Sequence, residues 1–463
     1  MKNIRSGLGI VLLLQLSIPQ LVSAQAPTLT EILDSAIVRD YHFENKQLEI
    51  QSAKIDQQHL KDAYLPKVTA SGKAAYLYSG FDLTSPAVSL PQLGMILPEN
   101  ENHYTLSSFF VNTGIDASVL IYSGGKVPNL KKAVAEKIHA ETVMLEKDKQ
   151  EIIAATLLAY DQLGLLKEVR KVLEESEKRL NENKRAADKA YSYGLITAYE
   201  QKKIELAQAQ LNSKFMEYQG KRDLILMQLH MLTNIDIERL ALLDKDLDVY
   251  PMADVGSSVS SRPELRALES AVLANQYKIK AASSWWKPKV AASTSLGYYG
   301  LLNGRLQSKD PMMLTGQKLD QDLQNFNLLP VFNVGIGFKW EVFDGRDGIH
   351  EVQKARLELK MAENNQKDAV EKLSLNLEKS KIEYNVSTEQ LNVKLTAKEI
   401  AQNGMNQASS EFKNGLIKSS QLLEAENDFQ NASMEYIQAV FNQRRAAVEL
   451  LKASGNLTET SFK

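Results

Sequence analysis

The side chains that carry chemistry in enzymes and metal sites are absent from this sequence or scattered along it. It contains no Cys, so neither a disulfide framework nor a thiolate metal site can form. No two of the six His residues lie at the spacing of metal ligands: His42, His59, His103, His139, His230 and His350. A phosphate-binding loop and a Gly-x-Ser-x-Gly motif are also missing. We therefore expect no enzyme, no metal and no cofactor.

Charged residues give no sign of a specific charged ligand. The chain has 55 basic and 57 acidic residues, whereas binding to nucleic acid requires clustered positive charge. The carboxylates lie among Lys and Arg residues, a pattern typical of solvated helix surfaces. No nucleic-acid partner is expected.

Residues 1–24 have the pattern of a secretory signal peptide. Lys2 and Arg5 precede a short apolar run at residues 7–16, and Val22-Ser23-Ala24 is a small-x-small cleavage site. The alternative is an N-terminal membrane anchor, but the apolar run is shorter than the roughly 20 residues that span a bilayer. We expect an exported protein.

The longest regular element is predicted at residues 126–193, where apolar or small residues return every seven positions. One line contains Ile152, Ala159, Leu166, Leu173, Leu180 and Ala187, and a second, offset line contains Ala155, Leu163, Val169 and Ala190. This seam predicts a helix packed on other helices. At about 1.5 Å per residue, the helix is on the order of 100 Å long.

The order of elements recurs about 221 residues later, which indicates two tandem repeats. The first repeat, residues 25–240, is expected to contain a helix from Thr28 to about Tyr64, strands at about 68–79 and 109–122, the long helix, and a returning helix at about 195–237. The second repeat, residues 261–463, is expected to contain a helix at 261–286, strands at about 290–299 and 331–343, a long helix at about 346–413, and a returning helix at about 416–452. Residues 241–260 are expected to form an irregular connector, and residues 80–107 and 300–330 to form loops. Capping boxes at residues 28–31 and 261–264 begin the first helix of each repeat.

The predicted strands have the alternation and length of outer-membrane strands. In the last of them, Phe332, Val334, Ile336, Phe338 and Trp340 lie on one face, and Asn333, Gly335, Lys339 and Glu341 on the other. The alternative is a small soluble sheet with one wet face. Four strands do not close a barrel, and an open sheet edge is costly in lipid. Strands in a membrane would therefore have to be shared between several chains.

The turns that end the two long helices repeat the same residue types. Tyr191, Gly194, Leu195 and Ile196 form the first tip, and Phe412, Gly415, Leu416 and Ile417 form the second. Each Gly is placed to close a helix in the left-handed conformation. The alternative to a binding role is that both are ordinary helix ends.

Several of these features together resemble the TolC-like outer-membrane efflux channels. They are the tandem repeat, the Pro-Lys-Val strand entries at 66–68 and 288–290, the Gly-containing turns after Tyr122 and Phe343, and the aromatic-x-x-Gly-Leu tips. The resemblance covers essentially the whole chain after the signal peptide. It implies a mixed α and β membrane protein, a homotrimer with a shared 12-stranded β-barrel, four strands from each chain, in the outer membrane and a long α-helical barrel in the periplasm.

The resemblance also implies a function. The protein would be the passive exit duct of a tripartite efflux or type I secretion system, with a periplasmic adaptor and an inner-membrane pump as partners and outer-membrane lipid around the barrel. The alternative is a periplasmic coiled-coil adaptor or scaffold without a membrane barrel.

The resemblance further implies roles for particular residues. Both tips would dock the adaptor, and the apolar face of residues 332–340 would contact lipid. Acidic residues after the second tip would narrow the periplasmic aperture, and the matching positions are Gln421 and Glu424, of which only Glu424 is acidic. The basic residue that often latches the closed tip falls at Ile417. If Glu424 is instead a solvated residue at the helix start, Glu200 after the first tip is the next candidate.

Overall fold

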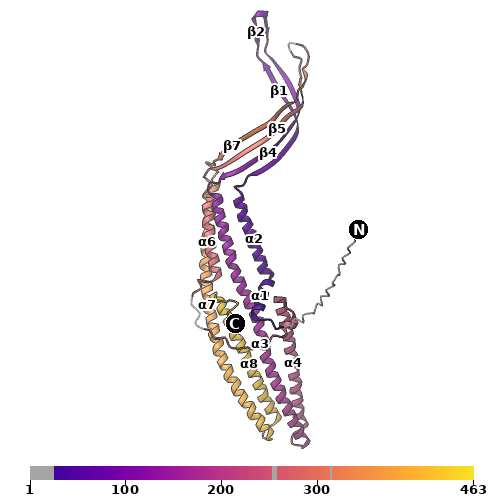
Figure 1. Cartoon of the computed structure of the whole chain (residues 1–463), viewed down its shortest axis with the longest axis vertical. Coiled ribbons are helices and arrows are strands. Elements are labelled where there is room, and N and C mark those ends of the chain that lie inside the picture. Colours follow the sequence, from indigo (N-terminus) through magenta and orange to yellow (C-terminus); the bar gives the residue numbers. More distant parts are fainter. Residues whose placement is uncertain (1–24, 253–257, 313–314, 463) are drawn as a thin grey trace, which may run out of the picture. The chain divides into compact units, whose positions relative to one another are not determined.

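The computed structural model describes residues 25–252, 258–312 and 315–462 (Figure 1). The signal peptide predicted at residues 1–24 lies outside this part of the chain. The described residues form long α-helices, a five-stranded antiparallel sheet and a two-stranded one, and the chain divides into two compact units. The first unit comprises Met1–Asn45, Glu146–Arg262 and Lys372–Lys463, and the second comprises Lys46–Leu145 and Pro263–Glu371. None of the described helices is long and apolar enough to cross a membrane.

The first helix is interrupted, where a single helix was expected. Helix α1 covers Leu29–Arg39 and α2 covers Tyr41–Asp62. Thr28 caps α1 as expected, because its hydroxyl accepts a hydrogen bond from the Glu31 N–H at 3.2 Å. At Asp40 the backbone is extended, and the carboxylate accepts from the Phe43 N–H at 2.7 Å. This second cap competes with a continuous helix and explains the break.

The two halves of the chain contain helices of matching length. The long helices α3 and α7 have 67 residues each, and the returning helices α4 and α8 have 36 each. Their bounds are Lys126–Ser192, Asp347–Lys413, Ala198–Thr233 and Ser419–Ser454. The short helix α5 covers Ile237–Leu240, and α6 covers Pro263–Ala282, so α6 ends before the expected Trp286. The hydroxyl of Ser261, expected to cap α6, donates to the Ser454 carbonyl at 3.0 Å.

The four expected strands lie side by side in the order β1, β4, β5, β7, all antiparallel. They cover Lys67–Ser85, Asn100–Tyr122, Lys289–Ser308 and Phe326–Lys339. The central pair, β4 with β5, joins one half of the chain to the other. A short strand, β6 (Asp320–Leu323), also pairs with β5.

The prediction of loops at residues 80–107 and 300–330 is wrong over much of their length, because strands extend into both ranges. β1 and β4 stay paired without a shift from Lys67 opposite Ser118 to Ser85 opposite Asn100. The polar composition of this stretch hid the strands, although cross-strand pairs such as Phe81 stacked on Tyr104 at 5.6 Å support them. The hairpin ends in β2 (Val88–Leu90), the 3₁₀ turn η1 (Pro91–Leu93) and β3 (Met95–Leu97). At the other edge of the sheet, β7 ends at Lys339 rather than at residue 343.

One face of the sheet is apolar and exposed. Phe332, Val334, Ile336 and Phe338 are 65–76% exposed in the single chain. The register places Leu296, Thr294, Ala292 and Val290 of β5 beside them. The alternation expected from the sequence is therefore present, and the apolar face has no cover among the described residues.

The seam of α3 is buried along its predicted line from Ala159 to Ala187. Further toward its start the pattern differs: Ala155 is exposed, whereas Ile153 and Leu157 are buried. These two side chains pack with Leu33 of α1 and with Leu457 and Phe462 near the C-terminus. The N-terminal helix and the C-terminal segment thus cover a second side of α3. A single heptad line predicts burial on one side only, so it does not predict these contacts.

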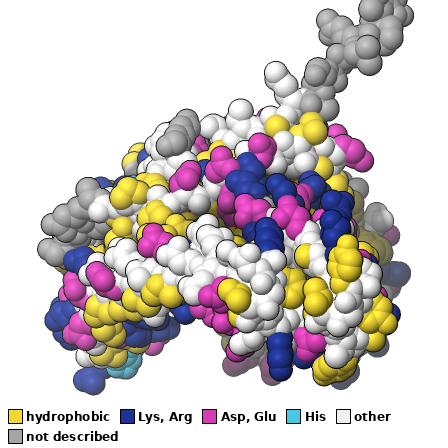
Figure 2. All heavy atoms as spheres, turned by 90° about the horizontal axis from the view of Figure 1, so that it is seen from below, with side chains coloured by type: hydrophobic (Ala, Val, Ile, Leu, Met, Phe, Trp, Pro, Cys, Tyr) yellow, Lys and Arg dark blue, Asp and Glu magenta, His cyan; other side chains and the backbone are white. Residues whose placement is uncertain are grey.

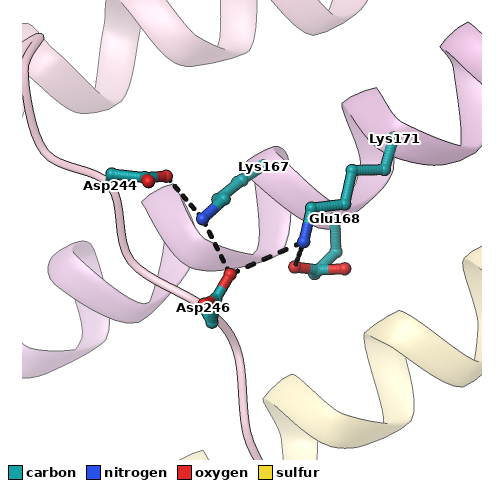
Figure 3. Close-up of polar contacts among 5 residues, drawn as sticks. All are labelled: Lys167, Glu168, Lys171, Asp244 and Asp246. Carbon is teal, nitrogen blue, oxygen red and sulfur yellow. Dashed lines mark hydrogen bonds and ion pairs between the residues drawn. The ribbon is translucent and has the colours of Figure 1, made fainter.

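The connector after α5 is fastened to α3 by charged side chains (Figure 3). Lys167 contacts Asp244 and, at 2.7 Å, Asp246, while Lys171 bridges Asp246 at 3.5 Å and Glu168 at 2.6 Å. The hydrogen bond to Asp244, with a smaller effect from the one to Asp246, raises the pKa of the Lys167 ammonium. The hydrogen bond from Lys167 lowers the pKa of Asp246. A buried ion pair, Arg444 with Asp161 at 2.8 Å, lies in the same unit, and Arg444 also donates to the Asp248 carbonyl.

Candidate functional site

The first tip, between α3 and α4, is closed by a left-handed glycine. Gly194 has φ 71°, its N–H donates to the Tyr191 carbonyl at 2.9 Å, and the Leu195 N–H donates to the Ala190 carbonyl at 2.8 Å. These two bonds form a Schellman motif, which requires positive φ at the glycine. Thr197 then begins α4, because its hydroxyl accepts from the Glu200 N–H at 3.3 Å.

The second tip, between α7 and α8, has the same geometry. Gly415 also has φ 71°, its N–H donates to the Phe412 carbonyl at 2.9 Å, and the Leu416 N–H donates to the Glu411 carbonyl at 2.9 Å. The Gln421 side chain accepts from the Lys418 N–H at 3.1 Å and so holds the start of α8. The repeated sequence pattern therefore forms two copies of one turn.

Both tips expose a leucine. Leu195 is 75% exposed and Leu416 73% exposed. In a Schellman motif the residue at this position usually packs back on the last turn of its helix, so two exposed leucines leave that contact unmade. Tyr191 is also exposed, whereas Ile196 and Ile417 are half-buried and pack on the core below.

Phe412 differs from its counterpart Tyr191. It is 8% exposed and belongs to a buried cluster with Ala187, Ile204 and Leu422. Phe412 therefore supports the second tip from inside instead of presenting a ring to solvent. In the view from below, hydrophobic side chains reach the surface among side chains of both charges (Figure 2).

A polar contact joins the starts of α4 and α8. The Ser419 hydroxyl donates to the Glu200 carboxylate and lies 3.3 Å from the Glu200 carbonyl. The hydrogen bond from Ser419 lowers the pKa of Glu200 against the opposing effect of burial, and the charge of Lys203 at 3.6 Å lowers it further. The sequence predicts Glu200 only as the second candidate for the aperture, after Glu424, and it gives no signal for Ser419.

A bidentate ion pair ties α3 to α8. Arg179 donates from two nitrogens to the two carboxylate oxygens of Glu426, each at 2.9 Å, and its guanidinium lies 4.9 Å from the ring centre of Phe429. Glu426 is 4% exposed. Sequence reasoning missed this pair, yet a signal was present: Glu426 follows Leu422 by four residues and precedes Phe429 by three, so it lies on the apolar stripe of α8.

The predicted aperture residues have different surroundings. Gln421 is exposed, and its side chain is used in the cap. Glu424 is exposed on the first turns of α8. In the described parts of the chain, no group of three or more His, Asp or Glu side chains is arranged to hold a metal ion.

Part of the chain that contains the second tip matches a known protein family. Residues 255–456 match the family model described as outer membrane efflux protein. This segment is therefore similar to outer membrane efflux proteins. Over these residues the resemblance seen in the sequence is confirmed.

Solved outer-membrane channels share the fold over almost the whole chain. The channel OprN has a TM-score of 0.70 and 17% identity, over 93% of this chain and 90% of that one. CmeC of Campylobacter jejuni has a TM-score of 0.68 and 16% identity, over 93% and 86%. MtrE of Neisseria gonorrhoeae has a TM-score of 0.68 and 15% identity, over 95% and 92%. No match was found among curated proteins. The likeness of fold to these channels thus includes the first half, which the family model does not cover.

Proposed function

We propose that this protein is the outer-membrane exit duct of a tripartite efflux or type I secretion system. The family match in the second half and the channel fold over 93% of the chain support this function. The duct is a passive conduit, located in the outer membrane with its helices in the periplasm. It performs no chemistry of its own, and the pump partner selects the cargo.

The sheet supports a trimer with a shared barrel. β1 pairs only with β4, and β7 only with β5, among the described strands, so each has one unpaired edge. Unpaired backbone groups in lipid cost several kcal/mol each. Three chains that join β7 to the β1 of the next chain pool four strands each and close twelve. The exposed apolar face around Ile336 then contacts lipid.

The matched elements of the two halves support tandem repeats. The helices of 67 and 36 residues occur once in each half, each pair is joined by the same turn, and the connector at 241–260 separates them. We place the repeats at residues 25–240 and 261–463.

The exposed tips support docking of a periplasmic adaptor. Leu195 and Leu416 are held on rigid turns and make no packing contact of the kind their position usually provides. An apolar residue on an ordered turn is suited to bind a partner. Tyr191, Gly194 and Ile196, with Phe412, Gly415 and Ile417, shape the two turns around them.

The test is the double variant Leu195→Asp with Leu416→Asp. It should yield a folded trimer that no longer restores resistance in cells that depend on the pump. Val38→Asp, on an apolar residue of α1 that is 84% exposed, is the matched control and should restore resistance normally. Transport that persists in the double variant at normal expression would exclude the tips as the docking surface. Recovery of the wild type in the aqueous periplasmic fraction would instead favour a soluble adaptor or scaffold.

A further inference from the structure

The far end of the β1–β4 hairpin is an exposed apolar tip. We use "hairpin end" for residues 86–98, which contain β2 and β3 (Figure 1). No charged residue occurs between Asp82 and Glu99. Val88 and Met95 are 45% and 53% exposed, and Ile96 is 74% exposed. The register pairs Val88 with Leu97 and Leu90 with Met95, which places these four apolar side chains on one face, while Ile96 pairs with Ser89 on the other face.

Charged and polar side chains separate the hairpin end from the apolar face of the strands. Asp82 bonds His103 at 2.6 Å across β1 and β4, and Arg305 bridges Asp320 at 2.5 Å across β5 and β6. A membrane strand needs about 9–11 residues, whereas β1 has 19. In the outer-membrane barrel proposed above, the hairpin therefore continues well past the bilayer, and its end lies in water. Exposed apolar patches in water mark contact sites.

We propose that the hairpin ends of three copies pack against one another over the external mouth of the barrel and close it. This inference rests on the trimeric duct proposed above. Three hairpins rise from one rim, so the contact is between identical surfaces related by the threefold axis.

The hairpin is long enough to reach that axis. Twelve strands about 4.8 Å apart and tilted about 40° form a barrel with a radius of roughly 12 Å. Beyond the aromatic pair of Tyr76 and Phe109, residues 79–85 add seven paired positions, and at about 3.3 Å each they extend roughly 23 Å. This overhang exceeds the radius.

The chemistry of the hairpin end suits its own copies. Three uncharged surfaces meet without repulsion, and attachment to one barrel gives them a local concentration on the order of millimolar. Pro86, Pro91 and Pro98 lack an N–H, so they oppose the addition of further strands and favour contact through side chains. The charged residues between the strands and the hairpin end oppose its return to the lipid of its own membrane.

Cross-linking tests the contact directly, because the chain has no native Cys. In the purified full-length trimer, Ile96→Cys should join subunits with a short bis-maleimide reagent, at a yield at least tenfold above Asp322→Cys. Asp322 is the control because it lies on β6, 91% exposed and outside the hairpin end. Equal yields at the two positions, or transfer of the Ile96→Cys label to lipid or to another protein, would overturn the proposal.

Conductance in a planar bilayer tests the closure. Apolar constrictions gate by excluding water, so Ile96→Asp should raise the mean conductance about twofold or more, while Ile96→Val should not. An unchanged conductance in Ile96→Asp, in a preparation that remains trimeric by native mass, would refute closure. A wild type that forms neither trimers nor channels would refute the proposed function itself, so the two failures are distinguishable.

Discussion

The ion pair between Arg179 and Glu426 makes a sharp energetic prediction, because its two members are buried to different degrees. The side chain of Glu426 is 5% exposed and that of Arg179 is 22% exposed. Arg179→Met leaves a buried carboxylate without its bidentate partner. Breaking a buried pair in this way costs about 3–5 kcal/mol, and we take the lower end because water reaches Arg179.

Replacing the other partner, Glu426, should reduce the stability by less. Glu426→Gln leaves a guanidinium that is partly solvated, still bonds Ser176 at 3.0 Å and lies 3.6 Å from Glu175. We expect a loss of about 1–1.5 kcal/mol, typical of a weakened hydrogen bond. The double variant Arg179→Met with Glu426→Leu removes both charges and should lie within about 1 kcal/mol of the wild type, because apolar side chains often replace a buried pair without loss.

Amide hydrogen exchange in the intact protein measures these differences locally. A loss of about 3 kcal/mol corresponds to roughly a 150-fold faster exchange where α8 packs on α3, if exchange proceeds by local opening. The expected order of exchange rates is Arg179→Met, then Glu426→Gln, then the double variant. Exchange in the double variant as fast as in Arg179→Met would show that lost packing, rather than an unpaired carboxylate, carries the effect, and the reasoning would fail.

Three further outcomes are expected. Ile336→Arg on the proposed lipid face should destabilise the assembled barrel by about 2–4 kcal/mol near mid-membrane, while Gly335→Ser on the opposite face should be tolerated; equal losses of heat-resistant trimer would contradict the assigned faces. In planar bilayers the wild type should prefer K⁺ over Cl⁻, and Glu424→Gln should weaken both that preference and the blockade by trivalent cations. Unchanged selectivity would show that the ring of acidic residues is not formed by Glu424, and Glu200 would be the next candidate. Because the Ser419 hydroxyl lowers the pKa of Glu200 below its ordinary 4.5, their contact stabilises the fold above that pH, and this stabilisation is lost as the pH falls through the lowered value. Ser419→Ala should therefore make amide exchange at the start of α8 faster at neutral pH and less sensitive to acid. An unaltered pH profile of exchange would contradict this.

Periodic elements could be predicted from the sequence, and contacts between them could not. The heptad line from Ala159 to Ala187 and the glycines of both tips express local geometry, so they were read correctly. The break at Asp40 depends on one side chain that competes with a helix bond. Residues 80–85 and 100–107 look like loop because polar residues and Gly outnumber their few apolar positions, and their pairing continues the register of the adjoining parts of β1 and β4.

The candidate site divides in the same way. The turns at Gly194 and Gly415 are signalled by residue type, but the burial of Phe412 and the exposure of Tyr191 depend on which helix lies opposite. The pairs Arg179 with Glu426 and Glu200 with Ser419 join residues more than 200 positions apart. A single sequence shows that Glu426 is a charge on an apolar stripe, and only the packed helices show which cation meets it.

The pairing of β4 with β5 also constrains how the chain is made. Ser118 of β4 lies opposite Ser293 of β5, so the centre of the sheet joins residues from the two halves, and the second edge of β4 stays unpaired until β5 has been synthesised and exported. Contacts between such distant residues form slowly and leave strands unpaired while they wait. The apolar alternation of β1 and β4 is an aggregation hazard during that interval. A newly exported chain should therefore depend on a periplasmic chaperone that holds these strands until the second half arrives, and a chain truncated before Lys289 should be degraded rather than inserted.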